Sequence, residues 1–432
     1  MFKKTDPNPQ LDIFTAPSML LGIRASKKYS DPNAWHNQFY SLVTTKIDEE
    51  IFKPLFPEGK KSGRPNASIR ILVAMSVLKE GFGCSDEDLF EKCEFDLLTR
   101  KALGMELLTD VTPSIDTYYL FRRRICEYQE RTGIDLMQLC FEQLAGKHVH
   151  LLKISGKCVR MDSKLIGSNI ARQSRYELIH TTLVKFLKTC TLTHLSPEQE
   201  ERAKEYLKED SSKTVYRSDS DTLQSNLARI GNFIMEMLAV FPATSPAHDL
   251  LLRLFEEQYV VMDGKAVLRD KKEVKADSLQ NPNDPDATYR AKNDQKVQGY
   301  VTNITETVEE GKPNIITSVQ VETAVFADCH FLQEAVENSE RVTDSTIEDL
   351  YADGAYQSPD NREFAKNHNA MQLKTGKMQG GCRWELIHMT RMVLPSGRLL
   401  LATPMSRQSC HKAGLQKAME NPMEQQNRLA LL

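Results

Sequence analysis

Hydrophobic residues in the first third of the chain recur with the 3.6-residue period of an α-helix. After Asp31-Pro32, a favourable helix start, one apolar stripe is formed by Trp35, Phe39, Leu42, Val43, Ile47 and Ile51. Ser68 and Ser85 are expected to cap the next two helices, and a further helix is predicted over Ile115–Tyr128. Glycine-containing turns separate these stretches, so the pattern predicts an all-helical module with helix-turn-helix-like spacing.

The pattern changes at Lys157–Asp162, where alternating residues predict a strand with Cys158, Arg160 and Asp162 on one face. Helical periodicity returns between about residues 175 and 259, and shorter segments follow. Strands are predicted at Val297–Thr302, Asn314–Glu322 and Leu350–Ala352, helices at about Asp328–Asn338 and Pro359–His368, and a hairpin over Trp384–Val393 and Arg398–Thr403. This order of elements predicts an α/β fold for the second part of the chain.

Composition and charge exclude several classes of protein. The 432 residues are 40% hydrophobic and 27% charged, with a net charge of −3, which argues against a disordered chain or a uniformly basic nucleic-acid binder. We expect no membrane span and no signal peptide, and nine scattered cysteines are expected to be free thiols in a reducing cytoplasm. Residues 301–350 carry two basic and eleven acidic side chains, and residues 351–432 carry eleven basic and six acidic ones. This asymmetry fits an acidic metal site beside a polyanion track, or an ordinary solvated acidic face.

Two aspartates follow predicted strands. Asp162 ends Cys-Val-Arg-Met-Asp, and Asp353 ends Leu-Tyr-Ala-Asp before a glycine. Carboxylates at the carboxyl ends of strands in an open α/β sheet point into the crevice where such proteins bind ligands, and two of them can hold Mg²⁺ together. An Asp-Gly pair after a strand is also typical of a simple turn, so the spacing alone leaves both interpretations open.

Several segments resemble bacterial insertion-sequence DDE transposases, in the same order along the chain. The catalytic-domain segments are Met161–Ala171, residues 283–290 with 299–303, and Tyr351-Ala-Asp-Gly-Ala-Tyr-Gln-Ser-Pro-Asp-Asn361. Upstream, Gly63-Arg-Pro65, Ile69–Phe82 and Ser114–Arg124 resemble the InsH-type N-terminal module of these proteins. The resemblance extends over most of the chain, and its most specific part surrounds Asp353.

The resemblance implies a domain order and a chemistry. It implies an N-terminal arm at 1–30, a helical DNA-binding domain at 31–130, a connecting helix at 131–155, and a ribonuclease H-like mixed-sheet catalytic domain at 156–432 with a helical insertion at about 175–275. Asp162 and Asp353 would be catalytic metal ligands for Mg²⁺, with Mn²⁺ able to substitute. The implied partners are double-stranded element-end and target DNA and a second copy of the chain on that DNA, without membrane or organic cofactor. The implied location is the bacterial cytoplasm, at the nucleoid when DNA is bound.

The third acid of such an active site is expected to be a glutamate on a C-terminal helix. After the predicted hairpin only Glu420 and Glu424 remain, and neither lies in the expected setting. We expect a chain cut short before the third acid, with Glu424, and less so Glu420, as the alternative metal ligand. Two other functions therefore stay open. One is a truncated, inactive DNA-binding remnant, and the other is a ribonuclease H-like nuclease without strand transfer.

Basic residues outside the catalytic domain are candidates for DNA contacts. Lys61 and Arg64 lie in a glycine-containing loop that suits phosphate contacts, although basic loops are common. Arg122, Arg123 and Arg124 could lay a helix on DNA, or they could form a solvated helix face. His148 and His150, spaced as on one strand face, are expected to be structural more often than metal-binding. Tyr356 is expected either to touch DNA near Asp353 or to pack over the following helix.

Overall fold

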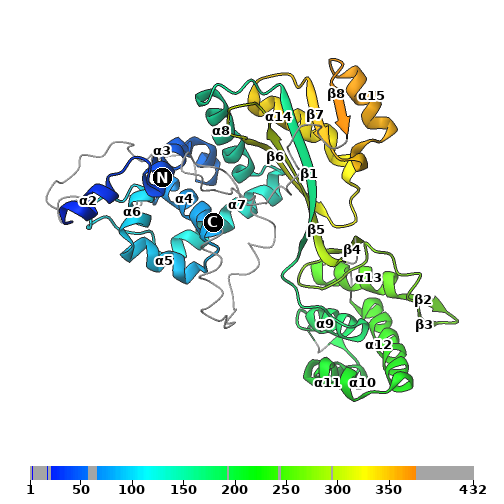
Figure 1. The fold of residues 1–432 in the computed structure, drawn as a ribbon. Coiled ribbons are helices and arrows are strands. Elements are labelled where there is room, and N and C mark those ends of the chain that lie inside the picture. Colours follow the sequence, from blue (N-terminus) through cyan, green and yellow to red (C-terminus); the bar gives the residue numbers. More distant parts are fainter. Residues whose placement is uncertain are drawn as a thin grey trace. The chain divides into compact units, whose positions relative to one another are not determined.

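The computed structural model describes residues 2, 17, 21–56, 66–191, 194–241, 245–292 and 295–375. The chain is divided into two compact units, and Figure 1 shows the elements of both. The first unit contains residues 1–162, 303–319 and 328–432, and the second contains residues 163–302 and 320–327. The structure is therefore a mixed α/β fold, with a helical N-terminal region followed by a six-stranded sheet and its helices.

The N-terminal region of the first unit is helical, as the periodicity predicts, but the apolar stripe from Trp35 to Ile51 is divided between one α-helix and two 3-10 helices. Its helices are α2 (Ile23–Tyr29), α3 (Trp35–Leu42), α4 (Ile69–Phe82), α5 (Asp86–Phe95), α6 (Leu97–Leu103), α7 (Ile115–Thr132) and α8 (Leu136–Leu151), with 3-10 helices at Thr44–Lys46 and Glu49–Leu55. Ser68 and Ser85 cap α4 and α5, as predicted, by accepting hydrogen bonds from backbone N–H groups of the first turn. The helix expected from Asp31 instead starts at Trp35, because the Asp31 carboxylate accepts from the Asn33 N–H (2.9 Å) and so closes a turn.

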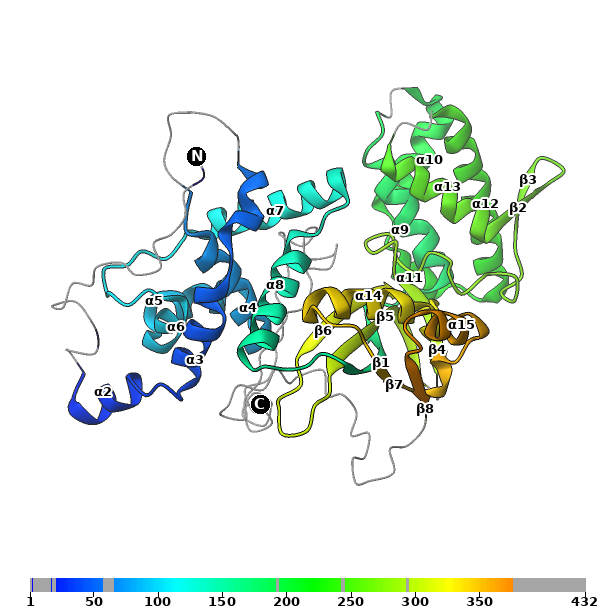
Figure 2. The same cartoon turned by 90° about the horizontal axis from the view of Figure 1, so that it is seen from above.

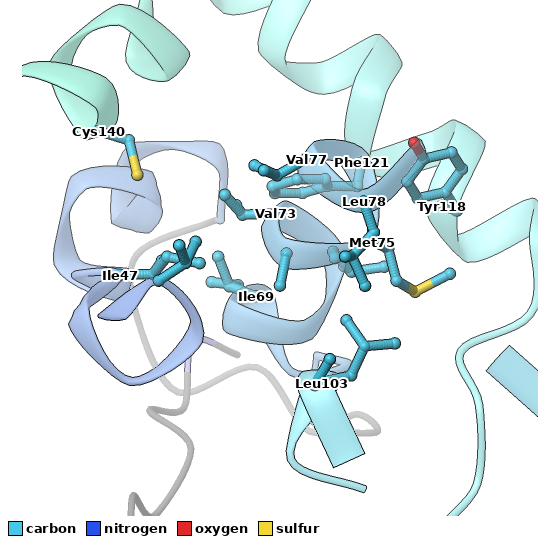
Figure 3. Close-up of a cluster of buried hydrophobic side chains, with 14 of the residues drawn as sticks. Ile47, Ile69, Val73, Met75, Val77, Leu78, Leu103, Tyr118, Phe121 and Cys140 are labelled. Atoms are coloured by element: carbon cyan, nitrogen blue, oxygen red, sulfur yellow. The ribbon is translucent and has the colours of Figure 1, made fainter. Parts of the chain in front are cut away.

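The core of this helical region lies around α4, which is hydrophobic on most of its surface (Figure 3). Ile69, Val73 and Leu78 of α4 are almost completely buried. They pack in one cluster with Leu103 of α6 and Phe121 of α7. Burial of a large apolar side chain contributes about 1.5–3 kcal/mol, so this cluster holds together helices that are individually short.

The last helix of this region, α8, packs against the sheet part of the same unit. It contacts α14 (Leu332–Thr343), and a Cβ on Gly146 would lie only 3.0 Å from the Val342 carbonyl oxygen. Arg341 of α14 pairs with Glu142 of α8 at 2.8 Å. A small residue and an ion pair therefore fix a close helix crossing between the N-terminal helices and the sheet.

Five strands of the six-stranded sheet follow the order β4-β5-β1-β7-β8. The sixth strand, β6, also pairs with β5. Its strands are β1 (Cys158–Gly167), β4 (Thr288–Lys292), β5 (Gln295–Thr307), β6 (Ile316–Thr323), β7 (Asp349–Ala352) and β8 (Gln372–Thr375). The pairs β1–β7 and β7–β8 are parallel, and β4–β5 is antiparallel. The strands predicted at Val297–Thr302, Asn314–Glu322 and Leu350–Ala352 are present as β5, β6 and β7. The strand predicted at Lys157–Asp162 is the first half of β1.

Backbone hydrogen bonds set the remaining strand directions. Val308 N–H donates to Cys158 O (2.9 Å), and Ser168 N–H donates to Gln298 O (2.8 Å), so β5 runs antiparallel to β1. Likewise, Thr307 N–H donates to Ile315 O where β5 turns back toward β6. The helices α14 and α15 (Pro359–Asn367) follow β6 and β7, contact each other, and lie on one side of these strands (Figure 2).

The second unit is mainly helical. Its helices are α9 (Arg175–Leu187), α10 (Pro197–Lys208), α11 (Ser211–Arg217), α12 (Ser220–Val240) and α13 (Pro246–Gln258), followed by a hairpin of β2 (Tyr259–Met262) and β3 (Lys265–Leu268). These helices have a hydrophobic core of their own, in which Phe233 and Leu254 are fully buried. Among the described residues of the whole chain, no helix has the length and apolar character needed to cross a membrane.

Candidate active site

Asp162 and Asp353 lie at equivalent positions on two neighbouring parallel strands. The β1–β7 register pairs Cys158 with Asp349 and Arg160 with Tyr351. Two residues further along each strand, the same register reaches Asp162 on β1 and Asp353 directly after β7. Asp353 keeps an extended backbone (φ −77°, ψ 174°), which continues the direction of β7. Because neighbouring strands lie about 4.8 Å apart, the register brings the two predicted carboxylates side by side. Asp353 lies at the carboxyl end of β7, but Asp162 lies in the middle of β1, which continues to Gly167, so the prediction that a strand ends at Asp162 is wrong.

Burial alternates along both strands and assigns the two aspartates to the same face of the sheet. Val159 and Met161 of β1, and Leu350 and Ala352 of β7, are fully buried. The intervening residues, among them Asp162, are half-buried, and Asp353 is exposed. The carboxylates therefore stand on the more accessible face, where a cation or a phosphate group can approach them.

The loop after Asp353 is fixed by its own side chains. The Asp353 carboxylate accepts from Ala355 N–H (2.8 Å) and caps a 3-10 turn over Gly354–Tyr356. Tyr356 is completely buried, and its hydroxyl donates to the Asn303 side-chain oxygen on β5 (2.8 Å). Asn361 of α15 donates to the Tyr356 carbonyl oxygen (2.8 Å). Of the two interpretations of Tyr356, the structure thus supports packing, and the residues after Asp353 in this motif hold the carboxylate in place.

Charged residues surround the aspartates on the same sheet face. Arg160, two residues before Asp162, forms an ion pair with Glu306 of β5. Lys374 of β8 pairs with the Asp349 carboxylate at 2.8 Å. Arg160 and Lys374 are thus each matched by an acid of their own.

The motif segment at 283–290 has a structural role in the second unit. The carboxylate of Asp284 is 4% exposed, and it accepts hydrogen bonds from the hydroxyls of Ser168 and Tyr300. The side chain of Arg290 donates to the carbonyl oxygen of Phe326 (3.0 Å). These contacts join the loop before β4 to the ends of β1 and β5, which explains why the resemblance includes residues without a place near the two aspartates.

The three consecutive arginines of α7 do not form one surface. Successive helical residues are about 100° apart, so Arg122, Arg123 and Arg124 point in different directions. Arg122 is largely covered, with its guanidinium 3.6 Å from Asp86 and over the ring of Tyr118. Arg124 lies over the ring of Phe56, and only Arg123 is exposed. Of the three arginines only Arg123 presents an exposed side chain, and a DNA contact by Arg122, Arg123 or Arg124 stays a prediction.

Other candidate residues lie outside the described residues, namely Lys61, Arg64, Glu420, Glu424 and the hairpin over 384–403. The structure instead exposes three basic side chains that sequence analysis did not select, Arg24, Lys27 and Lys28 of α2. No acidic residue lies within α2. A basic residue cluster in an arm-like region was the pattern that could have pointed to them.

His148 and His150 do not share a strand face, because residues 136–151 form helix α8. The apolar residues in this region follow a helical period, whereas the His-x-His spacing alone also fits a strand. His148 is 5% exposed and its Nε2 lies 2.9 Å from the Leu42 carbonyl oxygen, whereas His150 is exposed. The two imidazoles point to different sides of α8, which supports the structural interpretation of His148.

Burial of His148 predicts a dependence of stability on pH. Desolvation lowers the pKa of His148 below its ordinary value of 6.5, so the folded state favours the neutral imidazole. The unfolded chain then binds the proton more readily, and we expect stability to fall as the pH drops below about 6.5. His148→Gln should reduce this loss when urea unfolding is compared at pH 7.5 and 5.5. An equal loss in both proteins would contradict the prediction.

The donor chemistry of the site fits a hard divalent cation. Asp162 and Asp353 offer carboxylate oxygens, which Mg²⁺ prefers, and Mg²⁺ usually keeps several waters when it is bound by one or two carboxylates. Within the described residues, no group of three or more His, Cys, Asp or Glu side chains is arranged to hold a metal ion. The described part of the site thus offers two carboxylates to such a cation.

The comparison with known protein families assigns the N-terminal region. Residues 28–124 match the family model described as "Transposase domain (DUF772)". This segment includes α3 to α6 and part of α7, so a transposase domain is present there. No curated protein and no solved structure matches the chain.

The sequence pattern indicates the two aspartates but not the residues that support them. Glu306 and Asn303 lie on β5, in a strand segment where Thr302, Asn303, Thr305, Glu306 and Thr307 are all buried. A run of polar residues on both faces of a central strand is unusual, because buried polar groups require partners. That run was the available indication that β5 supports a polar site.

Proposed function

We propose that the chain is a DDE-type transposase that binds element-end DNA and catalyses phosphodiester hydrolysis and strand transfer. The observation that carries this proposal is the shared register of Asp162 and Asp353 on two parallel strands. It occurs in a chain whose residues 28–124 match a transposase domain. A site for metal-dependent phosphoryl transfer needs acidic oxygens that converge on one point, and equivalent positions on two adjacent parallel strands can supply them.

The order and directions of the strands support a ribonuclease H-like core in this proposal. Numbered along the chain without β4, the five strands have the spatial order 3-2-1-4-5, and the fourth and fifth run parallel to the first. Helices α14 and α15 make the connections to the parallel strands β7 and β8. In this proposal the helices α9–α13 form an insertion after the first strand of that core.

In the proposed reaction, Asp162 and Asp353 hold Mg²⁺, or Mn²⁺ in its place. The bound metal would supply an activated water and stabilise charge on the leaving oxygen of the phosphodiester. Tyr356 and Asn361 keep the Asp353 backbone extended, so that its carboxylate stays beside that of Asp162. A third ligand, with Glu424 as the candidate, belongs to the same proposal.

DNA binding in this proposal depends on local basic groups. Residues 28–124 contain 14 basic and 15 acidic side chains, so the matched segment as a whole does not attract a polyanion. We place the phosphate contacts on Arg24, Lys27 and Lys28 of α2, on Arg123, and on the loop with Lys61 and Arg64. A homodimer on paired element ends belongs to the same proposal.

Strand transfer distinguishes the proposed function from its two alternatives. In the test, the purified protein is incubated with DNA duplexes taken from the sequences that flank its coding sequence. The mixture also contains a supercoiled target plasmid and Mg²⁺ or Mn²⁺. A transposase is expected to join a duplex end to the plasmid. Cutting without joined products would indicate a nuclease, and retarded DNA without either product would indicate an inactive DNA-binding remnant.

A further inference from the structure

Arg160 is placed where it can compete with a cation for Asp162. The two residues are separated by one position on β1, share one face of the strand, and have Cα atoms about 6.6 Å apart. An extended arginine side chain spans that distance. Its guanidinium matches a carboxylate with two parallel hydrogen bonds, so an unrestrained Arg160 would bind the carboxylate that the proposed metal needs.

Glu306 holds Arg160 away from that position. Counting from the hydrogen bond between Val308 N–H and Cys158 O, Glu306 lies directly opposite Arg160 on β5. The Glu306 carboxylate accepts from Arg160, and the Glu306 side chain is only 10% exposed. Asn314 is a second hydrogen-bond partner of Arg160. With its side-chain amide turned so that both of its ends are hydrogen-bonded, Asn314 accepts from Arg160 Nη2 (3.1 Å) and donates to Thr307 O (3.0 Å).

We propose that Glu306 is a positioning residue that sequesters Arg160 and so keeps Asp162 available to a divalent cation. This inference rests on the proposed function, because it assumes that Asp162 binds metal. Glu306 itself is not placed as a ligand. In the same register Ile304, not Glu306, lies opposite Asp162. The Glu306 carboxylate binds Arg160, which precedes Asp162 by two residues on β1.

Burial distinguishes this pair from an ordinary surface ion pair. Arg160 and Glu306 side chains are 32% and 10% exposed, whereas Lys157 and Glu348, at the other end of β1 and β7, are 58% and 64% exposed. Surface pairs contribute at most about 1 kcal/mol and rearrange easily. A largely covered carboxylate with a fixed partner can instead hold a cationic side chain in one orientation.

The test measures Mn²⁺ binding directly, from the electron paramagnetic resonance signal of free Mn²⁺ titrated with the full chain. Glu306→Gln should weaken Mn²⁺ binding by about 10- to 100-fold, the range usual for residues that orient metal ligands. Removing the competing cation as well, in Arg160→Gln/Glu306→Gln, should restore the wild-type affinity. Arg160→Gln alone should bind Mn²⁺ as tightly as wild type or more tightly. Glu348→Gln is the matched control, because it removes one carboxylate of an exposed pair on the same sheet, and its affinity should not change.

The outcomes separate this inference from the proposed function. If wild-type binding does not depend on Asp162, the metal site and this inference are both overturned. If Asp162-dependent binding is present but Glu306→Gln binds normally, only the role of Glu306 is overturned. The same holds if Arg160→Gln weakens binding, or if the double variant is no better than Glu306→Gln, since the pair would then be merely structural. Thermal unfolding verifies that each variant folds. If Glu306→Gln does not fold, Arg160→Gln still tests the inference.

Discussion

Asp162→Asn and Asp353→Asn should each reduce Mn²⁺-dependent nicking of supercoiled plasmid by more than about 100-fold. Loss of a residue that only orients a metal ligand costs about 10- to 100-fold, and loss of a ligand should cost more. The amide keeps the shape of the side chain but removes the charge that the cation requires. Because the two residues share one register, we expect equal defects and no further loss in the double variant.

Two measurements keep this prediction specific to the site. DNA binding, measured by gel retardation, should stay unchanged in both variants, because the proposed phosphate contacts lie in the N-terminal region. Asp360→Asn and Glu348→Gln remove exposed carboxylates near the same strands and should cut DNA normally. Undiminished cutting by either site variant would show that the two aspartates do not carry the chemistry.

The sequence was sufficient to select Asp162 and Asp353 because the alternation of buried and polar residues before each of them is clear. What it did not contain was the pairing of those strands. Residues 160 and 306 are far apart in the chain, and only the antiparallel register of β1 and β5 makes Arg160 and Glu306 partners. A one-residue change of register would move every side chain to the other face, so such partners are properties of the sheet as a whole.

Two short motifs gave an incomplete picture of the local structure. The His-x-His spacing at 148 and 150 fits a strand, but the surrounding apolar residues continue helix α8 over several turns. Consecutive arginines at 122–124 suggest one patch in a linear sequence, yet a helix directs them to different sides. In both cases the longer-range period decided the structure, and the short motif did not. The third acid and the predicted hairpin lie outside the described residues and stay predictions.

The resemblance to transposases included residues with purely structural roles. The buried hydrogen bonds of Asp284, Tyr356 and Asn361 show why such motifs extend beyond the reacting groups. A carboxylate in a binding site depends on a fixed backbone, and the hydrogen bonds of Tyr356 and Asn361 fix the loop after Asp353. Motif specificity near Asp353 therefore reports the support of the site as much as its chemistry.

Gly299→Val should destabilise the second unit by at least about 3 kcal/mol, beyond the usual range for an overpacked core, because β5 approaches β1 closely at this residue. A Cβ at position 299 would lie 2.2 Å from the Ile166 carbonyl oxygen and 2.5 Å from the Ser168 nitrogen. Both are backbone atoms, so no side-chain rotation can relieve the contact. The Ser168 N–H to Gln298 O bond (2.8 Å) lies directly beside it and would be lost when the strands separate.

Gly167→Ala provides the matched control for this prediction. Gly167 is adjacent to the same contact, yet a Cβ there would meet no atom within 4 Å. We therefore expect the urea midpoint of Gly167→Ala to stay close to wild type, whereas Gly299→Val should unfold at markedly lower urea and lose resistance to limited proteolysis between residues 163 and 302. Equal stability of the two variants would show that β5 does not approach β1 so closely in solution. The predicted difference therefore tests the β1–β5 register, on which the placement of Glu306 opposite Arg160 also depends.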